Sequence, residues 1–177
     1  YELTMRSGLR VKDDIEEKGN GLSRVLHYDG YSSDDIVITD IFLTNSEGLS
    51  CKKFYTDDDC ELNIKYEAKI TIENPIIKIS FINEEGIVCM GSVIHTKKEY
   101  GDYRLAQKGR LRFKYFPLQL TTGNYKVSIV IFDTSHSYPF VASHYGYFSV
   151  MSEEAILTPG ENTPLCYPPV KFSFDRY

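Results

Sequence analysis

The sequence predicts an all-β protein, an antiparallel β-sandwich. Three observations lead to this fold class. Hydrophobic residues recur with a period of two rather than 3.6, seven or eight such segments follow one another at short spacing, and Gly, Asn and Pro turns separate them. Helical patterns are nearly absent, and only residues 10–19 offer one short helical turn.

The clearest alternation lies in residues 61–72. One face carries Leu62, Ile64, Tyr66, Ala68, Ile70 and Ile72, and the other carries Glu61, Asn63, Lys65, Glu67, Lys69 and Thr71. This pattern is typical of a half-buried antiparallel strand. Asn74-Pro75 ends it, since Pro has no N–H for the ladder. The next strand, 76–82, has Ile77, Ile79 and Phe81 as its inner residues.

Two further segments show departures from simple alternation. In 36–45, Ile36 and Ile38 share one parity while Ile41 and Leu43 share the other, so we expect a β-bulge at Thr39-Asp40. Residues 87–95 are apolar on both faces, and we expect both faces to be covered.

The remaining strands alternate regularly. We expect strands at 110–116, 125–133 and 145–150, with turns at 83–86 and 121–124. Inward positions are Leu111 and Phe113 in the first, and Tyr125, Val127, Ile129 and Ile131 in the second. A linker-like stretch from Ser152 to Pro164 precedes a detached alternating segment, 166–174.

At 177 residues, one domain is the simplest expectation. We divide the chain into a lead-in segment 1–34, a sandwich 35–151, and a linker with a C-terminal strand 152–177. The net charge of −5 argues against sequence-independent binding to nucleic acid. No apolar run is long enough for a transmembrane helix, and no signal peptide pattern is present. The chain looks like a piece of a longer protein.

Motifs for catalysis or metal binding are weak. The chain contains neither GxSxG nor a P-loop, so we expect no enzyme activity. Asp57, Asp58 and Asp59 are read as a solvated acidic turn rather than a calcium site. His95, His136 and His144 are weighed as metal ligands, but nothing in the sequence shows that they meet, so we expect neither a metal nor another cofactor.

The cysteines do not form a zinc pattern either. Cys51, Cys60, Cys89 and Cys166 make no CxxC, and we expect reduced thiols. A hairpin would bring Cys51 and Cys60 together, so the oxidation state of this pair stays open.

Aromatic and basic residues gather in two connections, and sugars are bound by aromatic rings together with fixed polar groups. The first connection, 95–105, contributes His95, Tyr100, Tyr103 and Arg104. The second, "DTSHSYPFVASHYGYF" (133–148), contributes His136, Tyr138 and His144. Outward cations on the strands add Lys69, Lys114 and Lys126. These ten residues are our candidate carbohydrate site; the alternative is that the tyrosines only cap the sandwich.

The order of motifs resembles one known family. The "ITD" strand, the I-x-F-x-x-E-x-G segment at Ile79 to Gly86, the F-P-L-x-L-x-x-G-x-Y segment at Phe116 to Tyr125 and the closing Y…F-x-V strand occur in this order. Over roughly Asp35 to Val150, this set is similar to the C-terminal domain of Wzt, the nucleotide-binding subunit of transporters that export O-antigen polysaccharide.

The resemblance implies an immunoglobulin-like or jelly-roll β-sandwich that binds carbohydrate without catalysis. Such a domain recognises the non-reducing, often capped end of the O-antigen on the cytoplasmic side of the inner membrane and couples chain completion to export. The implied partners are the polysaccharide, the ATPase and membrane subunits of the transporter, and a second copy, with the strand in 165–174 a candidate for exchange. The ATPase activity would belong to a separate N-terminal domain.

Two alternatives stay open. The first is a dimerisation or regulatory scaffold without glycan contact. The second is a sugar-binding module attached to a glycosyltransferase or methyltransferase. This chain lacks Trp, so Tyr, Phe or His would have to stack on a sugar. The identity of the sugar and of its cap does not follow from the sequence.

Overall fold

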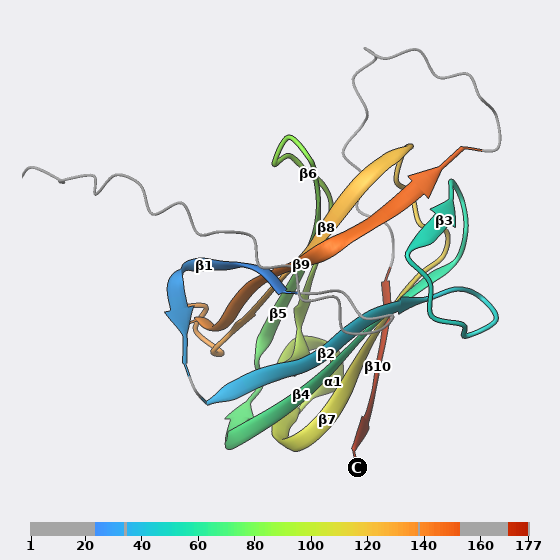
Figure 1. Cartoon of the computed structure of the whole chain (residues 1–177). Coiled ribbons are helices and arrows are strands. Elements are labelled where there is room, and N and C mark those ends of the chain that lie inside the picture. The colour runs from blue at the N-terminus through green and yellow to red at the C-terminus, as the bar shows by residue number, and fades with distance from the viewer. Residues whose placement is uncertain (1–23, 34, 138, 153–169, 177) are drawn as a thin grey trace, which may run out of the picture.

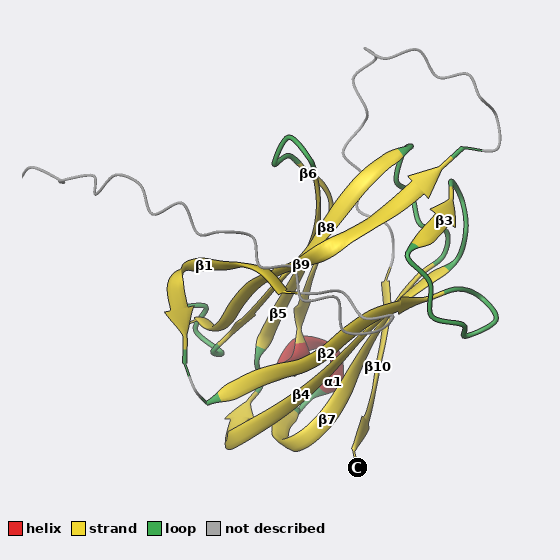
Figure 2. Cartoon of the chain, viewed as in Figure 1, coloured by secondary structure: helices red, strands yellow, loops and turns green. Residues whose placement is uncertain are grey.

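The structure is a computed structural model that describes residues 24–33, 35–137, 139–152 and 170–176. In these residues the chain forms two β-sheets and one short helix, α1 (Thr96–Tyr100) (Figures 1 and 2). The predicted all-β sandwich is confirmed. The expected helical turn at 10–19 lies outside the described residues.

Sheet A has six strands in the order β1-β9-β8-β5-β6, and β3 lies on the outer edge of β9 beside β1. Its strands are β1 (Arg24–Ser32), β3 (Lys53–Tyr55), β5 (Ile76–Asn83), β6 (Val88–His95), β8 (Gly123–Phe132) and β9 (Pro139–Met151). All pairings in this sheet are antiparallel except β3 with β9, which is parallel. Strand β6 therefore forms the other edge.

Sheet B has four antiparallel strands in the order β10-β7-β4-β2. They are β2 (Ile36–Thr44), β4 (Cys60–Glu73), β7 (Arg104–Tyr115) and β10 (Val170–Arg176). β10 pairs with β7 of the same chain, in a register that opposes Val170 and Tyr115. Exchange of this strand between two chains stays a prediction, and 166–169 lie outside the described residues.

The hydrophobic core lies between the two sheets, and aromatic rings connect them. The Phe81 ring of sheet A meets Tyr115 of sheet B edge-on at 5.1 Å between centroids, and meets Phe148 at 5.6 Å. All three side chains are fully buried or nearly so. Each such side chain stabilises the fold by roughly 1.5–3 kcal/mol through burial.

Most predicted inward positions are buried. Ile77, Ile79 and Phe81 in β5 have no exposed surface, and neither have Leu111 and Phe113 in β7. In β8, Val127, Ile129 and Ile131 are equally buried. The predicted bulge in β2 is confirmed, since the pairing with β4 shifts between Ile38 and Asp40. Ile36 and Ile41 thereby both reach the core.

Four expectations differ from the structure. Ile70, predicted on the inner face of 61–72, is 45% exposed, at the point where the pairing of β4 with β7 shifts between Ala68 and Ile72. Residues 87–95 are not covered on both faces: β6 is an edge strand, and Val88 and Val93 are about half exposed. Strand structure begins before Asp35, because β1 pairs with β9. Strand β9 begins at Pro139, so only 133–137 and Tyr138 connect β8 to it, and His144 lies within the strand.

Candidate functional site

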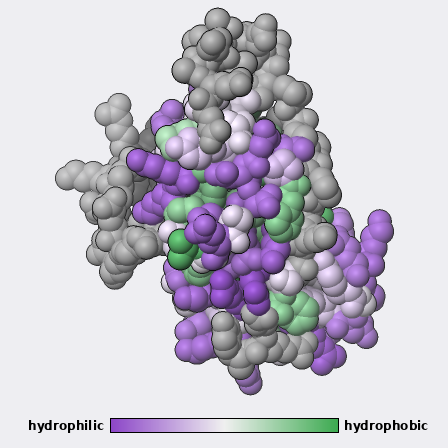
Figure 3. Space-filling view, turned by 90° about the vertical axis from the view of Figure 1, so that its right-hand side faces the viewer, coloured by the Kyte–Doolittle hydropathy of each residue, from purple (hydrophilic) through white to green (hydrophobic). Residues whose placement is uncertain are grey.

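The polar outer face of sheet B offers the most ordered constellation of polar side chains. Residues opposite each other in an antiparallel ladder share a face. Three rows therefore cross β2, β4 and β7 on this face: Thr44–Glu61–Lys114, Phe42–Asn63–Arg112 and Asp40–Lys65–Arg110. Figure 3 shows the side of the molecule that lies on the right in Figure 1, where β3 and β10 are found. Most of the described residues on this side are hydrophilic, and the hydrophobic ones form only small, separate patches.

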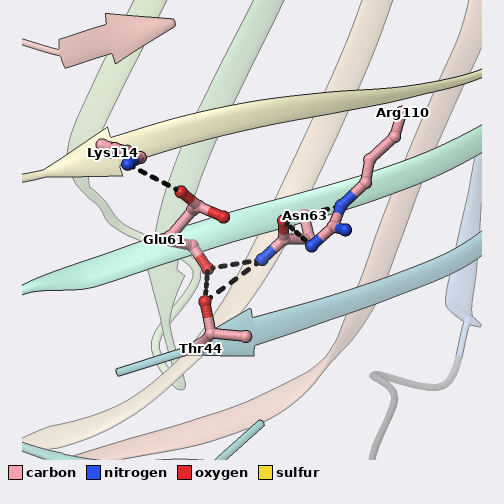
Figure 4. Close-up of polar contacts among 5 residues, drawn as sticks. All are labelled: Thr44, Glu61, Asn63, Arg110 and Lys114. Carbon is pink, nitrogen blue, oxygen red and sulfur yellow. Dashed lines mark hydrogen bonds and ion pairs between the residues drawn. The ribbon is translucent and has the colours of Figure 1, made fainter. Parts of the chain in front are cut away.

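Asn63 is the centre of this face, and it is fully buried although it points away from the core. Its Oδ1 accepts hydrogen bonds from Arg110 Nε at 3.0 Å and Nη2 at 2.6 Å. Its Nδ2 donates to Thr44 Oγ1 at 3.3 Å and to the carbonyl of Glu61 at 3.2 Å (Figure 4). Both ends of the amide are used, so its orientation is defined by its partners.

Arg110 is thereby held in one orientation. Asn63 occupies two of its N–H groups, and within the described residues the other three N–H groups make no hydrogen bond. The guanidinium carbon also lies 5.3 Å from the centre of the Phe42 ring. Lys65 Nζ lies at the same distance from that ring and pairs with Asp40 at 3.0 Å. A half-buried aromatic ring is thus flanked by two cations.

A small hollow adjoins this network where β4 begins. Its volume is about 170 Å³, and its lining consists of Thr44, Asn45, Ser46, Gly48, Asp59, Cys60, Glu61, Lys114 and Phe116. Sites for drug-sized ligands measure roughly 300–1,000 Å³, so this hollow suits one sugar ring or one substituent. Phe116 is 44% exposed beside it, and Lys114 pairs with Glu61 at 3.3 Å.

The loop that borders the hollow is ordered by its own side chain. Asn45 Oδ1 accepts hydrogen bonds from the backbone N–H of Glu47 at 3.1 Å and of Leu49 at 2.9 Å. Gly48 has a φ of 78°, a conformation that glycine adopts without strain. The hollow therefore has a preorganised wall, which lowers the entropic cost of binding a ligand.

The ten predicted site residues do not form one cluster. Lys69 and Lys114 lie on strands of sheet B, whereas Lys126 and His144 lie on strands of sheet A. Tyr103 is 3% exposed and its ring packs against Phe174 at 4.7 Å, so it is a core residue. Tyr138 lies outside the described residues.

The other four, His95, Tyr100, Arg104 and His136, lie at one end of the sandwich. His95 and Phe132 both oppose Ile76 in the ladder. His136 lies in the turn that follows Phe132, and the centroids of the two rings are 4.3 Å apart. Glu73 connects the two segments, because Arg104 pairs with its carboxylate at 3.4 Å and Thr134 Oγ1 donates to its carbonyl at 3.0 Å.

This end therefore joins the 95–105 connection and the 133–137 turn. It lies at the opposite end of β4 from the hollow, because β4 runs from Cys60 to Glu73. All four side chains are exposed there.

Burial changes the pKa of several groups without creating a nucleophile. Burial, and then the charge of Lys126, lower the pKa of His144, so the neutral imidazole is favoured. Burial raises the pKa of the Cys60 thiol well above its usual range, and burial also raises that of Cys51. Cys51, Cys60 and Cys89 are free thiols. These thiols are kept protonated, which is the unreactive form.

Within the described residues, no group of three or more His, Cys, Asp and Glu side chains is placed to hold a metal ion. In the same part of the chain, no helix has the length and apolar character needed to cross a membrane.

The sequence did not single out Phe42, Asn63, Arg110 and Phe116. A signal existed for Asn63, since alternation places it on the polar face of 61–72, where it is the one amide among charged residues and a threonine. Its contact with Arg110 depends on the register of β4 and β7, which hydrophobic periodicity does not define.

Comparison with known proteins gives one family. The family model of the Wzt C-terminal domain matches residues 27–160. A crystal structure of the C-terminal domain of Wzt resembles this chain with a TM-score of 0.59 and 13% identity, covering 73% of this chain and 80% of that one. A Niemann-Pick type C2 protein from the Japanese carpenter ant has a TM-score of 0.48 and 8% identity, covering 71% and 99%. No curated protein sequence matches.

Proposed function

Because the chain belongs to the family of Wzt C-terminal domains, we propose that it is a non-catalytic carbohydrate-binding domain of an O-antigen export transporter. Its ligand is the non-reducing, capped end of the polysaccharide. The domain would thereby couple chain completion to export at the inner face of the inner membrane. The outer face of sheet B, with the adjoining hollow, is the proposed binding surface.

The observation that carries this proposal is the network of Thr44, Asn63 and Arg110. It holds a guanidinium in one orientation, and three of its N–H groups, which make no hydrogen bond within the described residues, can donate to hydroxyl, carboxylate or phosphate oxygens. The hollow next to it has the size for one terminal residue, and Phe116 offers an exposed ring at its rim. Affinity per site should be weak, because sugar hydroxyls exchange water for protein contacts with little net gain.

The test is calorimetric titration of the chain with O-antigen oligosaccharides of the source strain, capped and uncapped. We expect Arg110→Ala to weaken binding of the capped form roughly tenfold or more, since a hydrogen bond to a charged group contributes about 1.5–3 kcal/mol. Lys108→Ala is the matched control: this cation on the same strand pairs with Glu67 at 2.7 Å and lies beyond the Asn63 network.

The outcomes separate the parts of the proposal. Equal affinity for capped and uncapped ends would exclude recognition of the cap, and no binding of either form would exclude the carbohydrate function. If Arg110→Ala binds normally while Tyr100→Ala or Arg104→Ala does not, the site lies at the opposite end of the sandwich. A thermal melt of each variant shows whether it is folded.

A further inference from the structure

The outer face of sheet A has a row of small side chains at its centre. In β5 and β8, the neighbours of Ser80 and Ser128 along the chain belong to the core between the sheets, so both serines point outward. In the ladder, Ser80 opposes Ser128, and the row continues on both sides to residues of β6 and β9. We call it the serine row, and its members are His144, Ser128, Ser80 and Gly91. It crosses four strands and is therefore roughly 14 Å long.

The two serine hydroxyls are confined and have no hydrogen-bond partner within the described residues. Ser80 and Ser128 are only 4% and 8% exposed, and neither hydroxyl makes a hydrogen bond in this part of the chain. Each hydroxyl oxygen still keeps a small accessible surface. Opposite residues in an antiparallel pair have Cβ atoms about 5 Å apart, so the two hydroxyls are neighbours. Because confined polar groups need hydrogen-bond partners, this pair points to a ligand that carries polar groups of its own.

Longer side chains flank the serine row on both sides. Two positions along the strands on one side, about 7 Å away, Lys126 opposes Tyr147. At the same separation on the other side, Lys78 opposes Val130 and Val93. Tyr147 is 47% exposed, so its ring can stack on an apolar face of a ligand that lies on the row.

The lysines that flank the row give this face a positive charge. Strands β5, β6, β8 and β9 contain no Asp or Glu, and Lys78 and Lys126 are their only Lys or Arg residues. Neither lysine makes an ion pair within the described residues. The adjoining turns carry acidic residues beyond the ends of the strands, namely Glu84, Glu85 and Asp133. In a chain with a net charge of −5, the centre of this face is therefore suited to a negatively charged ligand.

The ammonium group of Lys126 lies near the β9 end of the row. Burial, and then the charge of this lysine, lower the pKa of His144. The imidazole and the ammonium group can therefore meet the same ligand.

Other occupants fit this face less well than a sugar. A peptide strand would need free backbone groups, but β5 and β8 are paired on both sides. Nucleic acid would need more cations than two lysines. A sugar offers hydroxyls for the serine pair and a flat C–H face for the tyrosine ring, and a carboxylate or phosphate on it would meet a lysine.

We propose that the serine row, with Lys78, Lys126 and Tyr147, binds an acidic sugar unit from the body of the polysaccharide. This inference rests on the proposed function, because it takes the exported chain as the ligand. The two sheets form separate layers whose outer faces point in opposite directions (Figure 1), so one terminal unit cannot occupy both faces. Since the capped terminus occupies sheet B in the proposed function, the unit on sheet A is an internal one. Its binding does not depend on the cap.

The experiment is an amide chemical-shift titration of the chain with uncapped O-antigen oligosaccharide of the source strain. We expect the signals of Ser80, Ser128 and His144 to shift and to saturate. Ser80→Ala with Ser128→Ala should raise the dissociation constant about tenfold, since two hydrogen bonds are lost. Ser137→Ala is the matched control, because this serine is exposed in the turn after β8 and lies outside the row. It should leave the dissociation constant unchanged.

The charge of the ligand is tested separately. Lys126→Ala should raise the dissociation constant about tenfold. Lys97→Ala should leave it unchanged, because Lys97 is an exposed cation of α1 that makes no ion pair within the described residues. Raising sodium chloride from about 0.05 M to about 0.5 M should weaken binding severalfold through screening. Binding that responds neither to Lys126→Ala nor to salt would overturn the acidic nature of the ligand.

The outcomes separate this inference from the proposed function. Arg110→Ala should leave the shifts at the serine row in place, and the serine variant should leave binding of the capped end on sheet B in place. If the capped end binds at the Asn63 network while the signals of the serine row stay unchanged with both oligosaccharides, the inference is wrong and the proposed function stands. No shift anywhere in the chain would overturn both. Melting temperatures confirm that each variant is folded.

Discussion

Tyr66 and Gly109 show how a single pair of residues limits what the sandwich tolerates. They oppose each other in β4 and β7, and both are buried. A Cβ atom at position 109 would lie 2.6 Å from Cζ of the tyrosine ring. Glycine is needed here because the ring of its cross-strand neighbour occupies the space of a side chain.

We expect Gly109→Ala to lower the free energy of unfolding by about 1–3 kcal/mol, since overpacking forces a buried ring out of position. Urea denaturation measures this. In a Tyr66→Ala background the same change should cost little, because the obstructing ring is gone, and the double-mutant cycle gives the coupling. Equal losses in both backgrounds would mean that the ring is not the obstacle.

Asn63 is a second residue whose surroundings depend on its cross-strand neighbours. Asn63 lies on the outer face, yet it is buried, because Arg110 and Thr44 contact it from neighbouring strands. The alternating pattern of the sequence therefore predicts correctly that the Asn63 side chain points away from the core, but it does not predict that this side chain is buried.

Among the elements, β10 is held in place by its pairing with β7 and by an aromatic contact. It follows a long segment outside the described residues and adds to the free edge of β7. Phe174 packs on Tyr103, which anchors the chain just before β7. The tyrosine N–H donates to Asn74 Oδ1 at 2.9 Å, so this anchor also includes the β4–β5 turn.

We expect Phe174→Ala to lower the free energy of unfolding by about 1 kcal/mol, from the lost aromatic contact. Amide hydrogen exchange in 170–176 should also become faster. Tyr147→Ala is the control, because Tyr147 is a similarly exposed aromatic residue in β9. Unchanged exchange in 170–176 would show that Phe174 does not hold the strand in place.

The whole molecule has one continuous core. Side chains from both sheets belong to it, including Phe54 and Phe148 of sheet A and Leu62 and Phe113 of sheet B. A core shared by two sheets leaves neither sheet stable alone, so unfolding should occur in one step.

We therefore expect far-UV circular dichroism and tyrosine fluorescence to give the same urea midpoint. The chain has 14 Tyr and no Trp, so the fluorescence reports on tyrosines in both sheets, such as Tyr115 and Tyr125. Different urea midpoints for the two signals would mean that one sheet unfolds before the other.

The sequence by itself determined the fold class and the inner face of most strands. The reason is physical. A strand with one buried face has a hydrophobic residue at every second position, and the chain leaves a strand at turn residues such as Asn74-Pro75 and Gly86. It even defined the bulge at Thr39-Asp40, because two parities within one strand require an extra residue. The family followed from the order of motifs and agrees with the match over residues 27–160.

Only the tertiary structure decided which strands lie at the edges, and with it the candidate site. β6 has the composition of a strand that is covered on both faces, yet it lies at an edge of sheet A. The order of strands within a sheet depends on pairing between segments far apart in the sequence. Likewise, Arg110 meets Asn63, 47 residues away, only in the observed register. His95, Tyr100, Arg104 and His136 lie at one end of the sandwich, opposite the hollow. Local patterns record which way a side chain points, whereas neighbours across strands decide what it contacts.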